Sequence, residues 1–288
     1  MAKSTNFWTI FKVNFIKKYE KMTENNIKSN RKHGQIFGIK ISSTSKDEVL
    51  EFLKSRLETK ERFFFVTPNP EITLMARKDW LLKKAIAKSD LSIPDGIGLK
   101  FAFKFLYGED LNIIKGRELF LDIIKIADEK GLKVYLLGGF KDEAEKAKQE
   151  LVKVYKNIKI QANPAPRYGN NGQPATEKDR NLHKSLISKI KMFEPDLIFV
   201  GLSAPKQEKW IFRNFFRLDA TGAMAVGGTF NYIGKNIPLP PKWMEKLGLE
   251  WLWRLILEPI RLKRIINAVM VFPLIVFKSK FIKYDNRK

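Results

Sequence analysis

The stretch "DLIFVGLSAPKQEKW", residues 196–210, joins an apolar run to a polar loop and then to a helical pattern. The run "LIFV" has no polar residue, which is typical of a strand buried on both faces of a parallel sheet. Similar runs alternate with amphipathic segments along the chain: "RFFFVT", "DLSIP", "KVYLLG", "IKIQA" and "GAMAVG". This alternation predicts an α/β protein with a mostly parallel sheet and helices on both faces.

The composition limits the chemistry that the chain can perform. Its 288 residues are enough to bury a sizeable core. It has no cysteine, which excludes disulfides and thiolate metal sites. The two histidines, His33 and His183, lie far apart in the sequence and argue against a histidine metal site. We therefore expect no bound metal and no cofactor.

Positive charge gathers at both ends of the chain. The net charge is +23, of which residues 1–35 carry +6 and residues 242–288 carry +7. Both ends mix apolar residues with Lys and Arg, as do segments that lie in a membrane interface. The longest uncharged run, residues 265–277, is too short to span a bilayer and contains Pro273. The ends thus predict peripheral contact with an anionic membrane surface. The N-terminal end could equally be a flexible leader, and the C-terminal end could instead be a helix packed on the main domain.

A change of composition divides the chain. The stretch "NIPLPPKW", residues 236–243, has three prolines and is followed by a Trp- and Arg-rich helical pattern. We predict a basic N-terminal extension over residues 1–35, an α/β core over residues 36–240, and a helical appendage over residues 241–288. The last is called the C-terminal segment below, and we expect it to associate with the membrane.

Five of the predicted strands are followed by glycine or polar residues: "TPNPE" (67–71), "PDGIG" (94–98), "GGF" (138–140), "GLSAPKQE" (201–208) and "GGTFN" (227–231). Since the carboxyl ends of parallel strands meet at one edge of a sheet, these loops predict a ligand pocket there. The glycines would let a diphosphate approach the backbone; they are Gly138, Gly139, Gly227 and Gly228. None of them forms a G-x-G-x-x-G motif or a P-loop, so NAD and ATP sites are not indicated.

Asp95 is the first candidate for acid–base chemistry because it directly follows a predicted strand at the pocket edge. It could instead form an Asp-Gly turn or cap the next helix. Glu71 and Glu208 are further candidates, but each begins a helix and could favour its dipole. No D-x-D motif occurs among the aspartates, so a diphosphate leaving group would need cationic side chains instead of a metal.

Such cations occur in "LEWLWRLILEPIRLKR", residues 249–264. Arg254, Arg261 and Arg264 share one helical face if the helix continues through Pro259, and a second helix could instead start there. Arginine binds diphosphates well because its planar fork donates two hydrogen bonds. A solvated cationic face or contacts to lipid phosphates are the alternatives.

Five motifs together resemble the WecG/TagA/CpsF family of glycosyltransferases, over about residues 36–270. They are "TPNPEI", "IPDGIG", "GLSAPKQEKW", "VGGTFNYIGK" and "WMEKLGLEWLWRLILEPIRLKR", in the family's order and spacing. The resemblance implies a Rossmann-like core of the GT-E class, with a C-terminal appendage that closes the active site at the membrane. It also implies metal-independent, inverting transfer of a sugar, commonly N-acetylmannosamine or its uronic acid, from a UDP donor to an undecaprenyl-diphosphate-linked acceptor.

The same resemblance assigns roles to individual residues. Asp95 takes the position of the proposed general base, and Arg254, Arg261 and Arg264 take those of the appendage arginines. Thr67, Asn69 and Gln207 take polar pocket positions. Asn231 replaces the Asp that the family usually has in "GG.FD..AG", which keeps a hydrogen-bond acceptor but removes a charge. The family's "RAP.W" reads "PLPPKW" here, with one basic residue fewer.

The sequence therefore predicts a peripheral enzyme on the cytoplasmic face of the plasma membrane, making cell-surface polysaccharide or teichoic acid. Its partners would be a UDP-sugar, a lipid-linked acceptor and the membrane, with self-association through apolar surfaces as a further prospect. An epimerase or dehydrogenase acting on nucleotide sugars is one alternative, and the missing glycine fingerprint speaks against it. A nucleic-acid-binding protein is another, but the charge is concentrated in apolar-rich ends.

Overall fold

The computed structural model describes residues 33–281. Residues 1–32, most of the predicted N-terminal extension, lie outside this range, as do residues 282–288. From His33 onward the chain forms one compact unit. The division between core and C-terminal segment near residue 240 stays a prediction.

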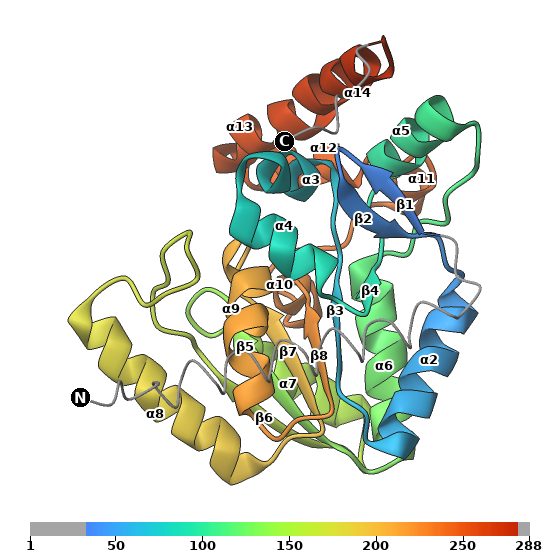
Figure 1. Ribbon diagram of the computed structural model, residues 1–288. Coiled ribbons are helices and arrows are strands. Elements are labelled where there is room, and N and C mark those ends of the chain that lie inside the picture. Colours follow the sequence, from blue (N-terminus) through green and yellow to red (C-terminus); the bar gives the residue numbers. More distant parts are fainter. Residues whose placement is uncertain (1–32, 282–288) are drawn as a thin grey trace, which may run out of the picture. The chain divides into compact units, whose positions relative to one another are not determined.

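Six parallel strands form the central sheet, in the order β4-β3-β8-β7-β5-β6 (Figure 1). Their bounds are β3 Phe63–Val66, β4 Leu91–Ser92, β5 Lys133–Gly138, β6 Lys159–Asn163, β7 Leu197–Gly201 and β8 Gly222–Ala225. Each strand coincides with one of the six predicted runs, β6 extending one residue beyond its run, and every pairing is parallel. The prediction of a Rossmann-like parallel sheet is therefore confirmed.

Helices cover both faces of this sheet, because the apolar strands alternate their side chains between two cores. Phe63 and Phe65 pack into one core, whereas Phe64 and Val66 pack into the other. The first core is completed by α2 (Lys46–Thr59), α6 (Gly116–Glu129), α7 (Glu143–Val154) and α10 (Thr229–Ile233). The second is completed by α3 (Pro70–Lys78), α4 (Trp80–Ala87), α8 (Glu177–Phe193) and α9 (Lys206–Asn214). A 3₁₀ turn, Phe215–Arg217, follows α9.

A small antiparallel hairpin, which the sequence did not predict, precedes the sheet. Its strands are β1 (His33–Ile36) and β2 (Ile39–Ser42). The hairpin shares a third apolar cluster with α5 (Ile97–Tyr107) and with α14 (Phe272–Phe281). In this cluster Phe272 is 1% exposed. Helix α14 is thus fixed to the α/β core by buried apolar contacts.

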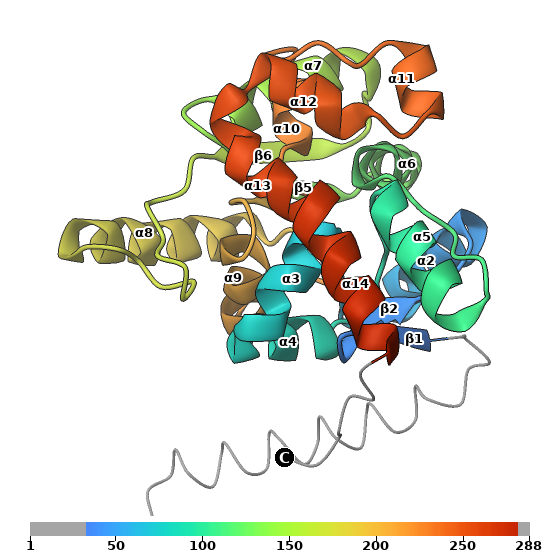
Figure 2. The same ribbon diagram turned by 90° about the horizontal axis from the view of Figure 1, so that it is seen from above.

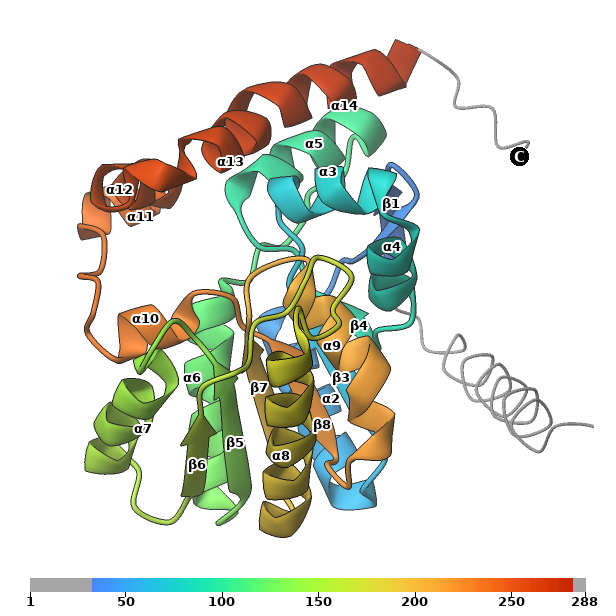
Figure 3. The same cartoon turned by 90° about the vertical axis from the view of Figure 1, so that its left-hand side faces the viewer.

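The rest of the C-terminal segment consists of short helices that cross the carboxyl-end side of the sheet (Figures 2 and 3). They are α11 (Lys242–Lys246), α12 (Glu250–Leu257), a 3₁₀ turn (Pro259–Arg261), α13 (Leu262–Ile266) and a π-helical turn (Asn267–Val271). The helix does not continue through Pro259, because proline has no N–H to donate, and α12 ends before it. The alternative of a new helical element starting there is confirmed. No helix within residues 33–281 is both long and apolar enough to cross a membrane.

The burial of Phe272 leads to a stability prediction. We expect Phe272→Ala to lower the free energy of unfolding by about 3 kcal/mol, because it leaves a cavity in the cluster that holds α14. Leu274→Ala is the matched control, since Leu274 is 62% exposed in the same helix; it should change stability by less than ~0.5 kcal/mol. Urea denaturation measures both values, and equal effects would contradict the packing described here.

Candidate active site

A cavity of about 1060 Å³ lies at the carboxyl edge of the sheet, where the loops after β3, β4, β5, β7 and β8 meet. The predicted convergence of these five loops is therefore confirmed. Two further segments, which the sequence did not place there, also line the cavity: the loop between β6 and α8, and the start of α6. Arg254, Glu258, Arg261 and Arg264 of the C-terminal segment complete the wall.

Thr67 and Asn69 enter the cavity from the loop after β3. The Thr67 hydroxyl donates a hydrogen bond to the Ala225 carbonyl (3.3 Å), which joins this loop to the end of β8. The Asn69 side chain accepts from the Ile72 N–H (2.9 Å) and caps α3, whose first residue is Pro70. Pro at this position is favourable because the first N–H of a helix has no partner in the helix. The local sequence "NP" therefore fixes the Asn69 side chain, whereas contact with β8 fixes that of Thr67.

Asp95 lies on the cavity wall, three residues after the end of β4. Its N–H donates to the Pro68 carbonyl (2.8 Å) and places the carboxyl group beside Gly116 and Thr67. The helix α5 is capped by Gly96 with no side-chain hydrogen bond, so Asp95 does not serve as a helix cap. Burial, followed by the negative charge of Glu250, raises the pKa of Asp95 to about 6. A carboxyl group with this pKa can accept a proton near neutral pH.

The four glycines divide into a structural one and three that line the cavity. Gly138 does not contact the cavity; its φ of 104° and close approach to the Gly201 carbonyl leave no space for a side chain. Gly139, Gly227 and Gly228 line the wall. A Cβ on Gly228 would lie 3.3 Å from the Arg254 guanidinium, so the absence of a side chain there lets the C-terminal segment approach.

Gln207 reaches the wall from the start of α9, and its amide group is already engaged on both sides. The oxygen accepts from the Gly227 N–H (3.0 Å), and the nitrogen donates to Glu208 (2.8 Å). The side chain thus holds the Gly227–Gly228 turn, as well as facing the cavity. Any ligand contact it makes would come in addition to these bonds.

Glu208 forms the inner end of this network, a role that its position at a helix start did not reveal. It is 1% exposed, and burial raises its pKa to about 7. Its Oε2 atom has no hydrogen-bond partner among the described residues. Sequence reasoning left this residue without a role because its burial depends on where α9 packs against the sheet.

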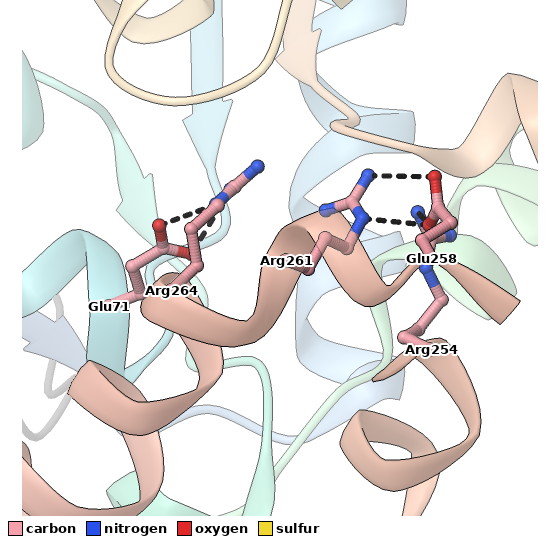
Figure 4. A network of polar contacts seen from close by, with 5 residues as sticks. All are labelled: Glu71, Arg254, Glu258, Arg261 and Arg264. Carbon is pink, nitrogen blue, oxygen red and sulfur yellow. Dashed lines mark hydrogen bonds and ion pairs between the residues drawn. The ribbon is translucent and has the colours of Figure 1, made fainter. Parts of the chain in front are cut away.

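The three predicted arginines all face the cavity, each from a different element (Figure 4). Arg254 is on α12, Arg261 is in the 3₁₀ turn after Pro259, and Arg264 is on α13. Arg254 and Arg261 both pair with Glu258, and Arg264 forms two hydrogen bonds to Glu71 (2.6 and 3.0 Å). Glu71 belongs to α3, so this last pair ties the C-terminal segment to the core. Glu71, which the sequence offered as a further candidate for acid–base chemistry, is therefore the ion-pair partner of Arg264.

Further cations and an aromatic ring line the cavity near these arginines. Lys115 pairs with Glu250 (2.6 Å) and Arg117 with Glu245 (2.7 Å), which links the start of α6 to the C-terminal segment. The Tyr232 ring lies 5.2 Å from the Arg117 guanidinium carbon and 5.0 Å from that of Arg254. No strand end marks Lys115 or Arg117, which is why the sequence did not indicate them.

Asn231 also lies on the wall, in the short helix α10. Its carbonyl accepts hydrogen bonds from the N–H groups of Asn236 (3.0 Å) and Ile237 (3.3 Å), which close the turn that follows α10. The backbone of this residue is therefore fixed, and its amide side chain belongs to the same cavity as Asp95.

Taken together, the cavity combines two carboxyl groups whose pKa is raised by burial, Asp95 and Glu143, with several guanidinium and ammonium groups. Cations of this kind suit a ligand with phosphate groups, since arginine donates paired hydrogen bonds to them. Within residues 33–281, no group of three or more His, Asp or Glu side chains could hold a metal ion.

Comparison with known proteins connects this cavity to a family. Residues 34–286 match the model of the glycosyl transferase WecG/TagA/CpsF family. The chain is 31% identical to an N-acetylglucosaminyldiphosphoundecaprenol N-acetyl-beta-D-mannosaminyltransferase of Bacillus subtilis, over 74% of this chain and 78% of that protein. It is 28% identical to a protein of the same name from Staphylococcus aureus, over 88% of this chain and 95% of that one.

The family match covers the strands, the cavity loops and the C-terminal arginines alike. The chain therefore belongs to the WecG/TagA/CpsF family of glycosyl transferases.

Proposed function

We propose that the protein transfers N-acetylmannosamine, or its uronic acid, from a UDP-sugar to a sugar carried on undecaprenyl diphosphate. The names of the Bacillus and Staphylococcus relatives support the transferred sugar and the acceptor. The family match favours this reaction over a dehydrogenase, an epimerase or a nucleic-acid-binding protein. The product would enter a cell-surface polysaccharide or teichoic acid.

The observation that carries the proposal is that Asp95 and the arginines of the C-terminal segment line the same cavity. In the proposed reaction the Asp95 carboxylate takes the proton of the acceptor hydroxyl, and the hydroxyl oxygen attacks the anomeric carbon. The bond between that carbon and the UDP oxygen breaks, with inversion. Arg254, Arg261 and Arg264 would stabilise the negative charge that grows on the departing diphosphate. No metal is required in this scheme because guanidinium groups supply the positive charge.

The rest of the cavity has a place in the same scheme. The Gly227–Gly228 turn and Gly139 would allow the diphosphate close to backbone N–H groups, and Thr67, Asn69 and Gln207 would orient the sugar or nucleotide. Asn231 would contact the donor without the charge of the usual Asp, which makes this position a candidate determinant of donor choice.

We also propose that the enzyme works at the cytoplasmic surface of the membrane. Apolar side chains of the C-terminal segment face outward; Ile260, for example, is 95% exposed, and Leu274 and Phe277 are also exposed. Lysines on the same helices would favour anionic lipids. Contact with the membrane would place the cavity near a lipid-linked acceptor. Self-association through these exposed side chains stays a prediction for analytical ultracentrifugation.

The role proposed for Asp95 predicts a defined pH profile. Since the active form is the carboxylate and its pKa is about 6, we expect kcat/KM to rise with pH up to about 6 and then to level off. Asp95→Asn should lower turnover at least ~10-fold, because general bases commonly contribute ~10²–10⁴-fold. UDP affinity should change little. Steady-state kinetics and calorimetric titration with UDP measure these quantities.

Stability separates a catalytic role of Asp95 from a structural one. Its pKa is raised above 3.8, the ordinary value of an aspartate side chain, so the folded state binds the proton more tightly than the unfolded state does. The ionised carboxylate therefore destabilises the fold, and this cost is fully present above about pH 6. The melting temperature of Asp95→Asn at pH 8 should therefore be no lower than that of the wild type. Asp110→Asn is the control at an exposed aspartate. Unchanged turnover in Asp95→Asn would remove Asp95 as the base.

Donor and metal requirements can be tested together. We expect transfer from UDP-N-acetylmannosamine or its uronic acid to an undecaprenyl-diphosphate-N-acetylglucosamine analogue, with the same rate in EDTA. Loss of activity in EDTA that added Mg²⁺ or Mn²⁺ restores would contradict the proposed use of arginines alone. A panel of UDP-sugars read by mass spectrometry identifies the donor.

The membrane surface predicts the effect of a double substitution. Ile260→Glu combined with Leu274→Glu should abolish binding to vesicles of phosphatidylglycerol and phosphatidylethanolamine, because two carboxylates would enter the apolar contact. Transfer to a short-chain acceptor in solution should continue. Met192→Glu is the control, since Met192 is 84% exposed on α8, away from this segment. Vesicle flotation measures binding, and retained binding by the double variant would place the membrane contact elsewhere.

A further inference from the structure

Every arginine that the C-terminal segment brings to the cavity is already bonded to a carboxylate of this chain (Figure 4). Arg264 has its own partner, Glu71 on α3. Arg254 and Arg261, in contrast, share one partner, Glu258, which lies between them in sequence and in space. A ligand with phosphate groups would thus meet arginines whose hydrogen bonds are in use.

The two arginines bind the Glu258 carboxylate as arginines bind a phosphate group, with several guanidinium N–H groups donating to one anion. Oε2 of Glu258 contacts both Arg254 and the Nε atom of Arg261 (2.7 Å), and Oε1 accepts a longer bond from the Arg261 guanidinium (3.4 Å). One carboxylate therefore joins two forks through three contacts. Glu258 itself lies on the cavity wall, so its two oxygens occupy space that a ligand could enter.

The charges in this corner come from two arginines and two carboxyl groups. Two guanidinium groups share hydrogen bonds to a single carboxylate, that of Glu258. Glu143, on the same wall, interacts with both guanidinium charges, and burial raises its pKa. The pKa of Arg261 is lowered, first by burial and then by the nearby positive charge of Arg254. Because both arginines are bonded to one carboxylate, an anion with more than one negative charge would pair with them better than Glu258 does.

Arg254 does not depend on Glu258 alone for its position. Its guanidinium lies over the Tyr232 ring and against Gly228, so it stays directed at the Gly227–Gly228 turn through contacts on the core side. Without Glu258, this arginine would still face the place where a diphosphate would meet the backbone. Glu258 is therefore not needed to position Arg254, and its carboxylate instead occupies space that a ligand could fill.

We propose that Glu258 is an internal stand-in for the diphosphate: it pairs with Arg254 and Arg261 in the empty enzyme and is displaced from them when the nucleotide diphosphate binds. This rests on the proposed function, because it takes the diphosphate of a UDP-sugar as the ligand. Glu258 keeps two close cations from repelling one another, and it makes the site selective. A ligand must carry enough charge to replace a carboxylate, so UDP gains at this position what an uncharged nucleoside cannot.

The stand-in role predicts that its removal tightens ligand binding. Glu258→Gln keeps the size of the side chain and removes the competing charge, so UDP affinity should rise about 5-fold or more. Uridine, which has no phosphate, should bind as it does to the wild type. The free variant should melt at a lower temperature because two cations lose their partner, and UDP should raise its melting temperature more than that of the wild type. Isothermal titration calorimetry and differential scanning fluorimetry give both readouts.

Glu250→Gln is the matched control, since Glu250 lines the same cavity but pairs with Lys115. It removes one negative charge without freeing Arg254 or Arg261. A gain in UDP affinity that is clearly larger for Glu258→Gln than for Glu250→Gln supports displacement. Equal gains would mean that removing any negative charge from the cavity strengthens UDP binding, and they would overturn the proposal. Glu258→Asp is a second variant that keeps the charge but is too short to join both arginines. It should show a smaller gain than Glu258→Gln, and it carries the test if the latter fails to fold.

The outcomes also separate this inference from the proposed function. If wild-type protein does not bind UDP at all, the proposed function fails. If the wild type binds UDP and Glu258→Gln binds it equally or more weakly, the proposed function survives and the stand-in does not. Glu258 would then be a support that orients the two arginines.

Discussion

The ion pair between Arg264 and Glu71 completes the cavity, because it joins the C-terminal segment to α3 over the carboxyl ends of the strands. Two further pairs, Lys115 with Glu250 and Arg117 with Glu245, make the same connection at the start of α6. Exposed ion pairs contribute little to stability, but these lie partly buried around one cavity and fix where the arginines point. The α/β core supplies Asp95, and the C-terminal segment supplies positive charge. Neither part contains the whole site.

Burial of charged groups in the cavity shifts their pKa values, and these shifts suit the proposed chemistry. Asp95 has a raised pKa because burial and Glu250 disfavour its ionised form, and this is the property that a general base needs near neutral pH. Arg261 shows the opposite shift because it is buried beside another cation. The two groups lie in one cavity, so a phosphate ligand and an acceptor hydroxyl would each relieve one of these unfavourable charges. Strain of this electrostatic kind is common at catalytic sites.

The sheet could be predicted from the sequence because its strands are short, continuous apolar runs. Such runs lack the three-to-four-residue spacing of an amphipathic helix. "FFFV" and "LIFV" became buried strands, and the polar loops after them met at one edge, as parallel geometry requires. The hairpin of residues 33–42 was missed because its apolar residues are few, and two of them, Ile36 and Ile41, are buried against α5 and α14, far along the chain. The helix break at Pro259 was left open, since a proline can either interrupt a helix or start the next one.

Side-chain contacts between residues far apart in the sequence could not be predicted from the sequence. Arg264 lies 193 residues from Glu71, and Gln207 lies 20 residues from Gly227, so only tertiary packing reveals that the side chains meet. For the same reason Lys115, Arg117 and Glu208 entered the site only through the structure. The resemblance of motifs located Asp95 and the arginines, but it did not indicate that each arginine already holds a carboxylate.

A crystal structure of the full chain with UDP tests the central claim most directly, because it shows where the diphosphate binds. The account predicts phosphate oxygens within hydrogen-bond distance of Arg254 and Arg261, beside the Gly227–Gly228 turn, with the sugar side of the β-phosphate directed at Asp95. A diphosphate held instead at Arg167 and Lys206, two other cations of the cavity wall, with Glu258 still bound to both arginines, would contradict it.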